Sequence, residues 1–221
     1  MDLTRVSFPI TWIVLGWASA AVLLVHAARR APWSRFADSE QVHVFYGTIF
    51  SLVILWNLQA TVGDGFTFHL LGIGAFTLLA GPWLALVGGA VAIVVQIAVR
   101  GGEWASAGIA YTTMVAVPVA SIWSVLHFSE RRLPPNFFVY VFVATFFGAA
   151  LSFAAAGLAG ATALTWGAGR DAALVFGEYV PYLVYLAFGE ATLTGMLLTL
   201  AVVYRPQWVA SFDDARYLND R

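Results

Sequence analysis

The fold is decided by one apolar stretch from His69 to Val99, which reads HLLGIGAFTLLAGPWLALVGGAVAIVVQIAV. As one straight helix it would be about 46 Å long, well beyond the roughly 30 Å hydrocarbon core of a bilayer. Its middle, Ala80-Gly81-Pro82-Trp83, disfavours a continuous helix, because the residue before a proline resists the helical region. The stretch therefore predicts two short helices, 69–80 and 83–99, joined by a tight turn.

The rest of the chain is equally apolar. Hydrophobic residues make up 61% of it and charged residues only 10%, against about 25% charged in soluble domains. Because the apolar segments are continuous rather than alternating, they predict an all-α polytopic transmembrane helical bundle and not a barrel. Five further spans are expected at 8–28, 42–61, 105–127, 136–165 and 173–204. A formal net charge of −1 argues against nucleic-acid binding, and the lack of cysteine excludes thiolate ligands and disulfides.

The arginines decide between six and seven spans. With seven spans and the N-terminus outside, the short cytoplasmic loops and tail hold eight arginines and the outer side three, whereas six spans give five against six. The positive-inside bias therefore favours seven spans with a cytoplasmic C-terminus. We expect one transmembrane domain over 1–204 and a short cytoplasmic tail over 205–221. The predicted cytoplasmic arginines are Arg29, Arg30, Arg35, Arg131, Arg132, Arg205, Arg216 and Arg221.

In this topology His69 is the one histidine on the outer side, whereas His26, His43 and His127 fall at cytoplasmic helix ends. An imidazole at the mouth of a lipid-buried segment is unfavourable unless it is paired, hydrated or ligating. Asp64 precedes it in an acidic turn, and imidazole with carboxylate suits a divalent transition-metal ion. The alternative is a histidine that snorkels to the surface and caps a helix start.

Glu190 is the second unusual residue, because it lies inside an apolar span with Thr194 one turn further on the same face. A carboxylate there needs a partner in the bundle interior. It is either a metal ligand or ion-pair strut, or a protonated side chain bonded to a neighbouring helix. Glu178, near the outer boundary, could face the same cavity as His69 or face water, and water is the expectation.

No nucleophile–base set, phosphate-binding loop or H-E-x-x-H motif occurs in the sequence. The sequence thus predicts no catalytic residues and no ATPase of its own, and transport would require a partner protein.

Several runs of this sequence carry a resemblance. HLLGIG from His69 and LLAGPWLALV from Leu78 are followed by a block from Ala105 to Pro118 and by FGEATLTG from Phe188. In order and spacing these runs resemble the CbiM family, the membrane substrate-binding subunits of cobalt and nickel energy-coupling-factor ABC transporters. The likeness covers roughly 42–204. The blocks RRLPPNFFVY from Arg131 and YRPQW from Tyr204 resemble a related branch of bacterial membrane proteins.

The resemblance implies a metal held by the N-terminal amine, by a histidine at the second position and by the histidine that corresponds to His69. This chain has Asp2 at the second position and so departs from the family pattern. The resemblance also implies cobalt or nickel as the ion, and a coupling-factor transmembrane subunit with cytoplasmic ATPases as partners.

We therefore expect a CbiM-like subunit in a bacterial inner membrane that binds a divalent transition-metal ion on the outer face for ATP-driven uptake. The candidate ligands are His69, Asp64, Asp2, the amino terminus at Met1, and Glu190; Arg29, Arg30, Arg35, Arg131 and Arg132 would dock the partner. Two alternatives stay open: a non-transporting membrane metalloprotein, either an enzyme or a metal-site assembly factor, and a structural subunit of a larger membrane complex.

Overall fold

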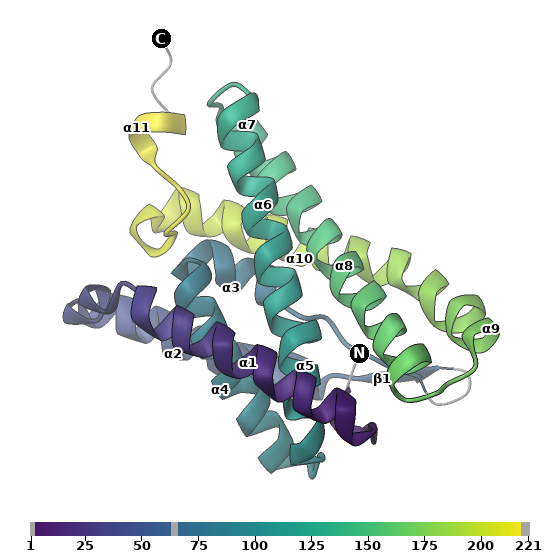
Figure 1. Ribbon diagram of the computed structural model, residues 1–221. Helices are drawn as coiled ribbons and strands as arrows, with labels where there is room; N and C mark the ends of the chain where they lie inside the picture. The colour runs from purple at the N-terminus through teal and green to yellow at the C-terminus, as the bar shows by residue number, and fades with distance from the viewer. Residues whose placement is uncertain (1–2, 63–65, 218–221) are drawn as a thin grey trace.

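The computed structural model describes residues 3–62 and 66–217. Its fold is the predicted all-α bundle with one small addition, a two-stranded hairpin (Figure 1). The first half contains α1 (Ile10–Arg30), α2 (Ser39–Asn57), β1 (Ala60–Val62), β2 (Phe66–Phe68), α3 (Ile73–Ala80) and α4 (Pro82–Arg100).

The second half consists of three long helical rods, each with a π-helical stretch inside it. They contain α5 (Ala107–Tyr111) and α6 (Val117–Arg132), then α7 (Phe137–Val139) and α8 (Gly148–Thr162), then α9 (Ala172–Leu174) and α10 (Val180–Tyr204). The π-helical stretches lie at Thr112–Ala116, Tyr140–Phe147, Ala163–Gly167 and Val175–Tyr179. After α10, residues Pro206–Trp208 form a 3-10 turn and Asp214–Tyr217 form α11.

Five helical segments in the described ranges are long and apolar enough to cross a membrane: Ile10–Arg30, Pro82–Arg100, Trp104–Arg132, Phe137–Gly167 and Ala172–Tyr204. Each overlaps a predicted segment closely. The other two helices predicted as spans are α2, whose first turn carries Glu40, and α3, which has only 8 residues. Seven membrane crossings and the sidedness of the termini stay predictions.

Successive segments run back and forth between two ends of the bundle, which we call the Arg35 end and the His69 end. Side-chain hydrogen bonds tie segments together at the Arg35 end, from Arg35 to the carbonyl of Ala80 and from Gln41 to the carbonyl of Gln207. At the opposite end, Ser7 donates to Glu103 and Asn57 donates to Gln96. In Figure 1, α7 and α11 lie near one end and β1 and α9 near the other.

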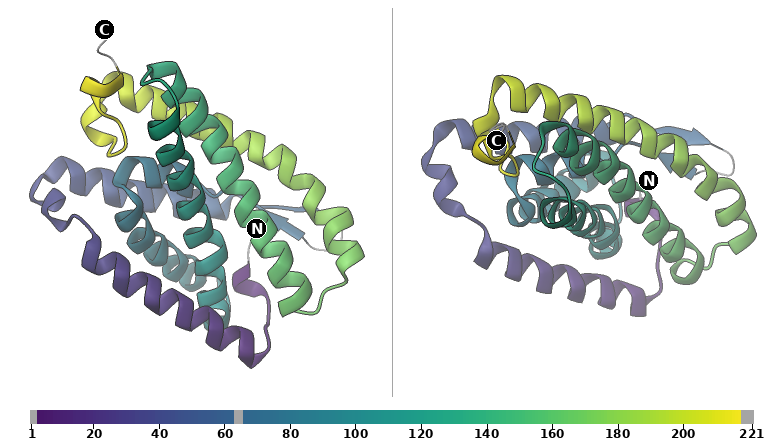
Figure 2. Two further views of the ribbon diagram at one scale, coloured as in Figure 1. Left: turned by 45° about the horizontal axis from the view of Figure 1, so that its top comes forward. Right: turned by 90° about the horizontal axis from the view of Figure 1, so that it is seen from above.

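The predicted tight turn in the apolar stretch is confirmed. Gly81 has a φ of 86°, which a side chain would strain, and Pro82 takes the first position of α4, where it loses no helical hydrogen bond. All eight residues of α3 are buried, so this short helix lies at the centre of the bundle. In the right-hand view of Figure 2, α1 (purple) and α10 (yellow-green) run along opposite edges.

Two predicted boundaries are wrong. The predicted span at 42–61 ends as a helix at Asn57, and Ala60 pairs instead with Phe68 in the antiparallel hairpin. The predicted helix at 69–80 begins only at Ile73. In both places the apolar sequence favours a helix. The backbone N–H and carbonyl groups instead form hydrogen bonds with partners elsewhere in the chain.

Candidate metal-binding site

The loop from His69 to Gly72, between β2 and α3, is held by a carboxylate distant in the sequence. Glu190, on α10, accepts hydrogen bonds from the backbone N–H groups of Leu71 (2.8 Å, to Oε2) and Gly72 (2.7 Å, to Oε1). Only 2% of its surface is exposed. Two parallel bonds to consecutive N–H groups use both carboxylate oxygens, and they place negative charge at the start of α3, where the helix dipole favours it.

Gly72 is required at this point. Its φ of 66° lies in the left-handed region, and a Cβ built on it would lie 2.7 Å from Cδ2 of Leu52. The left-handed turn brings the two N–H groups onto the Glu190 carboxylate and then directs the chain into α3. The loop conformation thus depends on a glycine in the loop and a carboxylate on α10.

Trp56, near the end of α2, holds the same loop from its other side. Its Nε1–H donates to the carbonyl oxygen of Leu71 at 2.8 Å, and its side chain is completely buried. Leu71 is therefore held on both sides, because its N–H donates to Glu190 and its carbonyl accepts from Trp56. The indole ring also lies against the imidazole of His69, with ring centroids 5.9 Å apart.

His69 is 3% exposed, and its Nδ1 lies 2.9 Å from the carbonyl oxygen of Leu70. A backbone carbonyl can only accept, so this contact assigns a proton to Nδ1, and in the neutral ring the lone pair is then on Nε2. Metal-ligating histidines commonly donate their second ring N–H to such a carbonyl, which fixes the tautomer and the ring orientation. The alternative of a snorkelling histidine at a helix start does not fit, because His69 is buried and α3 begins four residues later.

A polar network supports Trp56 from behind. Asn57 Nδ2 donates to Gln96 Oε1 at 3.3 Å, Gln96 Nε2 lies 3.4 Å from the carbonyl of Trp56, and Arg100 donates to the carbonyl of Asn57 at 3.2 Å. One signal for this network was visible in the sequence, since Gln96 is a rare polar residue in the apolar stretch. No such signal indicated that Trp56 would contact the loop.

The other predicted ligands are not brought together by the described part of the chain. Met1, Asp2 and Asp64 lie outside it, and residues 3–62 and 66–217 contain no group of three or more His, Cys, Asp or Glu side chains able to hold a metal ion. The first residues that are described, Leu3 and Thr4, are buried, with 1% and 2% of their surfaces exposed.

Three further predictions can be checked. Glu178 is exposed, as expected. Thr194 is buried like Glu190, and its hydroxyl has no hydrogen-bond partner among the residues that the structure places. Thr194 lines a mostly apolar groove of about 770 Å³ between α2, α3 and α10. His43 lines the same groove, with Nδ1 2.6 Å from the carbonyl of Ser39.

The predicted docking arginines differ in what they contact. Arg35 is half-buried and donates to the carbonyl of Ala80 (3.1 Å) and to Oε1 of Gln41 (2.6 Å); its burial lowers the pKa of the guanidinium. Arg30 lies over the ring of Trp83, 5.8 Å from its centroid. Arg29, Arg131 and Arg132 are exposed.

The sequence profile of CbiM, described as "Cobalt uptake substrate-specific transmembrane region", matches residues 4–208. The chain belongs to the CbiM family. No curated protein matches the chain.

Two solved structures share the fold of this CbiM-family protein. One is a truncated transition metal transporter, with a TM-score of 0.78 and 15% identity over 92% of this chain and 97% of that one. The other is a transition metal transporter, with a TM-score of 0.76 and 15% identity over 90% of each chain. At this identity the likeness establishes the architecture, and the site must be argued from this chain's own residues.

Proposed function

We propose that this CbiM-family protein is a metal uptake subunit that binds a divalent transition-metal ion through His69. Membership in a family of cobalt uptake regions supports the substrate class. The observation that carries the proposal is the position of His69: a buried imidazole with Nδ1 on a backbone carbonyl, in a loop fixed by Glu190 and Trp56.

His69 alone does not complete a coordination shell. The amino terminus at Met1, Asp2 and Asp64 are the proposed further ligands, since nitrogen and carboxylate donors suit ions such as Co²⁺ and Ni²⁺. Asp2 would replace the histidine that the family resemblance implies at the second position. A carboxylate is a harder ligand than imidazole, so the metal preference of this chain is expected to differ from that of a protein with two histidines.

Glu190 was also a candidate ligand. We propose instead that it positions the loop, because both of its oxygens already accept from N–H groups. Glu190 lies 119 residues after Leu71 in the sequence. A residue of the last long helix would therefore set the shape of the site.

The first experiment measures metal content. Purified wild type and His69→Ala are incubated with Co²⁺ or Ni²⁺, desalted and analysed by mass spectrometry of the metal. Wild type should retain metal and His69→Ala should lose it, while the matched variant His43→Ala should behave as wild type. Equal metal content in the wild type and His69→Ala would refute the proposal.

The second experiment tests sidedness. The chain has no cysteine, so Gly63→Cys introduces a single thiol at a position between β1 and β2 in the sequence. A membrane-impermeant maleimide should label it in intact bacterial cells if the His69 end faces outward across the inner membrane. Labelling only after the cells are broken would place this end inside and overturn capture from the outer face.

The third experiment tests energy coupling. We propose that uptake requires a coupling transmembrane subunit and cytoplasmic ATPases. These partners would dock at three of the exposed arginines of the Arg35 end, Arg29, Arg131 and Arg132. Cells that express the chain should lose metal uptake when the coupling ATPase is deleted. Replacement of the three arginines by glutamine should reduce co-purification of the partner and leave metal binding intact; unchanged co-purification would exclude this docking surface.

A further inference from the structure

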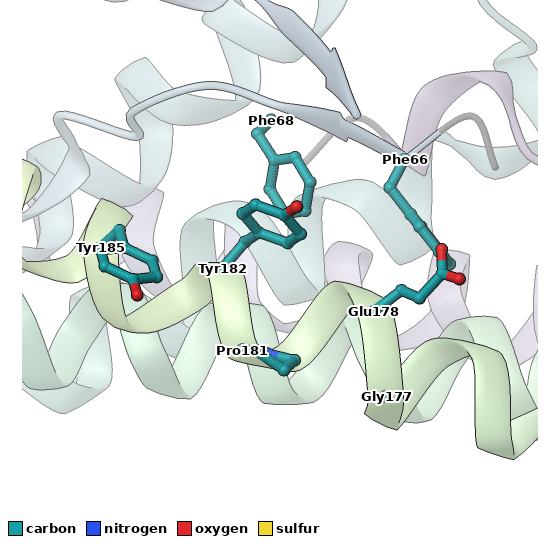
Figure 3. Close-up of a pocket in the computed structure, with 7 residues that line it drawn as sticks. All are labelled: Phe66, Phe68, Gly177, Glu178, Pro181, Tyr182 and Tyr185. Carbon is teal, nitrogen blue, oxygen red and sulfur yellow. The ribbon is translucent and has the colours of Figure 1, made fainter. Parts of the chain in front are cut away.

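A second pocket opens at the His69 end, between β2 and the first turns of the α9–α10 rod, and its volume is about 540 Å³ (Figure 3). His69 does not line it. Its walls consist of aromatic rings, one carboxylate and two small residues on the helix. The seven lining residues are Phe66, Phe68, Gly177, Glu178, Pro181, Tyr182 and Tyr185.

The strand supplies one wall of this pocket. Side chains in a strand alternate between faces, so Phe66 and Phe68 project from the same side of β2, and both are buried. Tyr179 packs behind them, with its ring stacked on that of Phe68 at a centroid distance of 5.2 Å and an interplanar angle of 12°. This wall is therefore a fixed aromatic surface.

The helix supplies the facing wall. Glu178, Tyr182 and Tyr185 are spaced by four and three residues, which places them along one side of the rod. Figure 3 shows the Glu178 carboxylate beside the ring of Phe66, and the ring of Tyr182 beside that of Phe68. The rings of Tyr182 and Phe68 are 5.5 Å apart, between centroids.

Both kinds of lining group favour a cation. Aromatic ring faces carry negative potential, and Glu178 adds a carboxylate for which the described part of the chain provides no hydrogen bond or ion pair. Phe66 already attracts one cation, since the guanidinium of Arg170 lies 5.6 Å from its ring centroid. Arg170 does not line the pocket, and within the described residues it forms no ion pair with Glu178.

The chemistry also selects the kind of cation. A small hydrated metal ion needs several oxygen, nitrogen or sulfur ligands, and this pocket offers a single carboxylate. An alkylated ammonium ion has a diffuse charge and an apolar surface, and aromatic faces with one acidic group recognise it. We propose that this pocket is a binding site for an organic monocation of the quaternary ammonium type, separate from the His69 loop.

The test uses choline and its neutral isostere 3,3-dimethylbutan-1-ol, which has the same shape without the charge. Binding of each to the purified full chain in an uncharged maltoside detergent is measured by calorimetry. Choline should bind and the neutral alcohol should bind at least about tenfold more weakly. His69→Ala should bind choline as wild type does, which keeps this outcome independent of the metal site.

Variants identify the lining groups. Glu178→Gln and Tyr182→Leu should each weaken choline binding by about tenfold, within the range measured for cation–ring contacts. Tyr182→Phe keeps the ring and should bind as wild type, and so should Tyr46→Leu, which removes an exposed tyrosine outside the pocket. Equal binding of choline and the alcohol, no binding at millimolar choline, or unchanged binding by Glu178→Gln would overturn the proposal.

Discussion

Replacement of Glu190 by glutamine is the sharpest test of how the loop is held. The amide keeps one acceptor oxygen and presents an NH₂ group to the second backbone N–H, so one of the bonds to Leu71 and Gly72 is lost. A hydrogen bond to a charged group contributes about 1.5–3 kcal/mol, and a buried N–H left without a partner costs about 1–3 kcal/mol. Since these terms overlap, we expect the free energy of unfolding to fall by about 2–4 kcal/mol.

In a chain of this size, that loss corresponds to a decrease in Tm of about 4–16 °C. Groups that orient a metal ligand typically change metal affinity by about 10–100-fold when they are removed. Glu190→Gln should therefore bind Co²⁺ about 10–100-fold more weakly in equilibrium dialysis, and its thermal unfolding in detergent should begin earlier. Glu178→Gln is the matched control on the same rod, because its carboxylate is exposed, and it should change neither measurement.

X-ray absorption spectroscopy of the cobalt-loaded proteins separates positioning from ligation. If Glu190 positions the loop, Glu190→Gln saturated with Co²⁺ keeps the wild-type number of oxygen and nitrogen neighbours. The loss of one oxygen neighbour would make Glu190 a ligand. Wild-type metal affinity together with an unchanged Tm in Glu190→Gln would contradict the whole account of the loop.

Three further outcomes are expected. Gly72→Ala should lower the free energy of unfolding by about 1–3 kcal/mol, because φ at this position is positive and the added Cβ would clash. Gly47→Ala is the control, since its Cβ would meet nothing within 4 Å, and it should be neutral or stabilising when thermal unfolding is measured. Ser211→Ala loses the bond from its hydroxyl to the carbonyl of Leu78 (2.9 Å), so hydrogen exchange in residues 209–212 should quicken, and unchanged exchange would show that this bond contributes nothing. Burial raises the pKa of Tyr217 above 10 in the folded chain. The stability that the protonated Tyr217 contributes is therefore complete below pH 10 and is lost as the pH rises through the pKa of the folded state. Limited proteolysis should cut the tail faster at pH 11 than at pH 9, and Tyr217→Phe should reduce that difference.

The sequence was sufficient for the helical class, for the turn at Gly81-Pro82 and for the position of five long segments, because these follow from continuous apolarity and from proline chemistry. It also indicated Glu190 and His69, since polar groups in apolar spans need partners. It could not show that the N–H groups of Leu71 and Gly72 bind Glu190 rather than continue a helix. Nor could it show the hairpin, because strand pairing depends on residues brought together by the rest of the fold.

The way α3 is held has a consequence for the order of events during synthesis. Glu190 binds the N–H groups just before this helix, and the backbone N–H of Ala210 and the hydroxyl of Ser211 bind the carbonyls of Leu79 and Leu78 at its other end. Both clamps follow α3 in the sequence, so they leave the ribosome after it. The nascent helix must therefore wait in the translocation machinery or beside its neighbours until more than a hundred further residues have been added, and only then is the His69 loop locked.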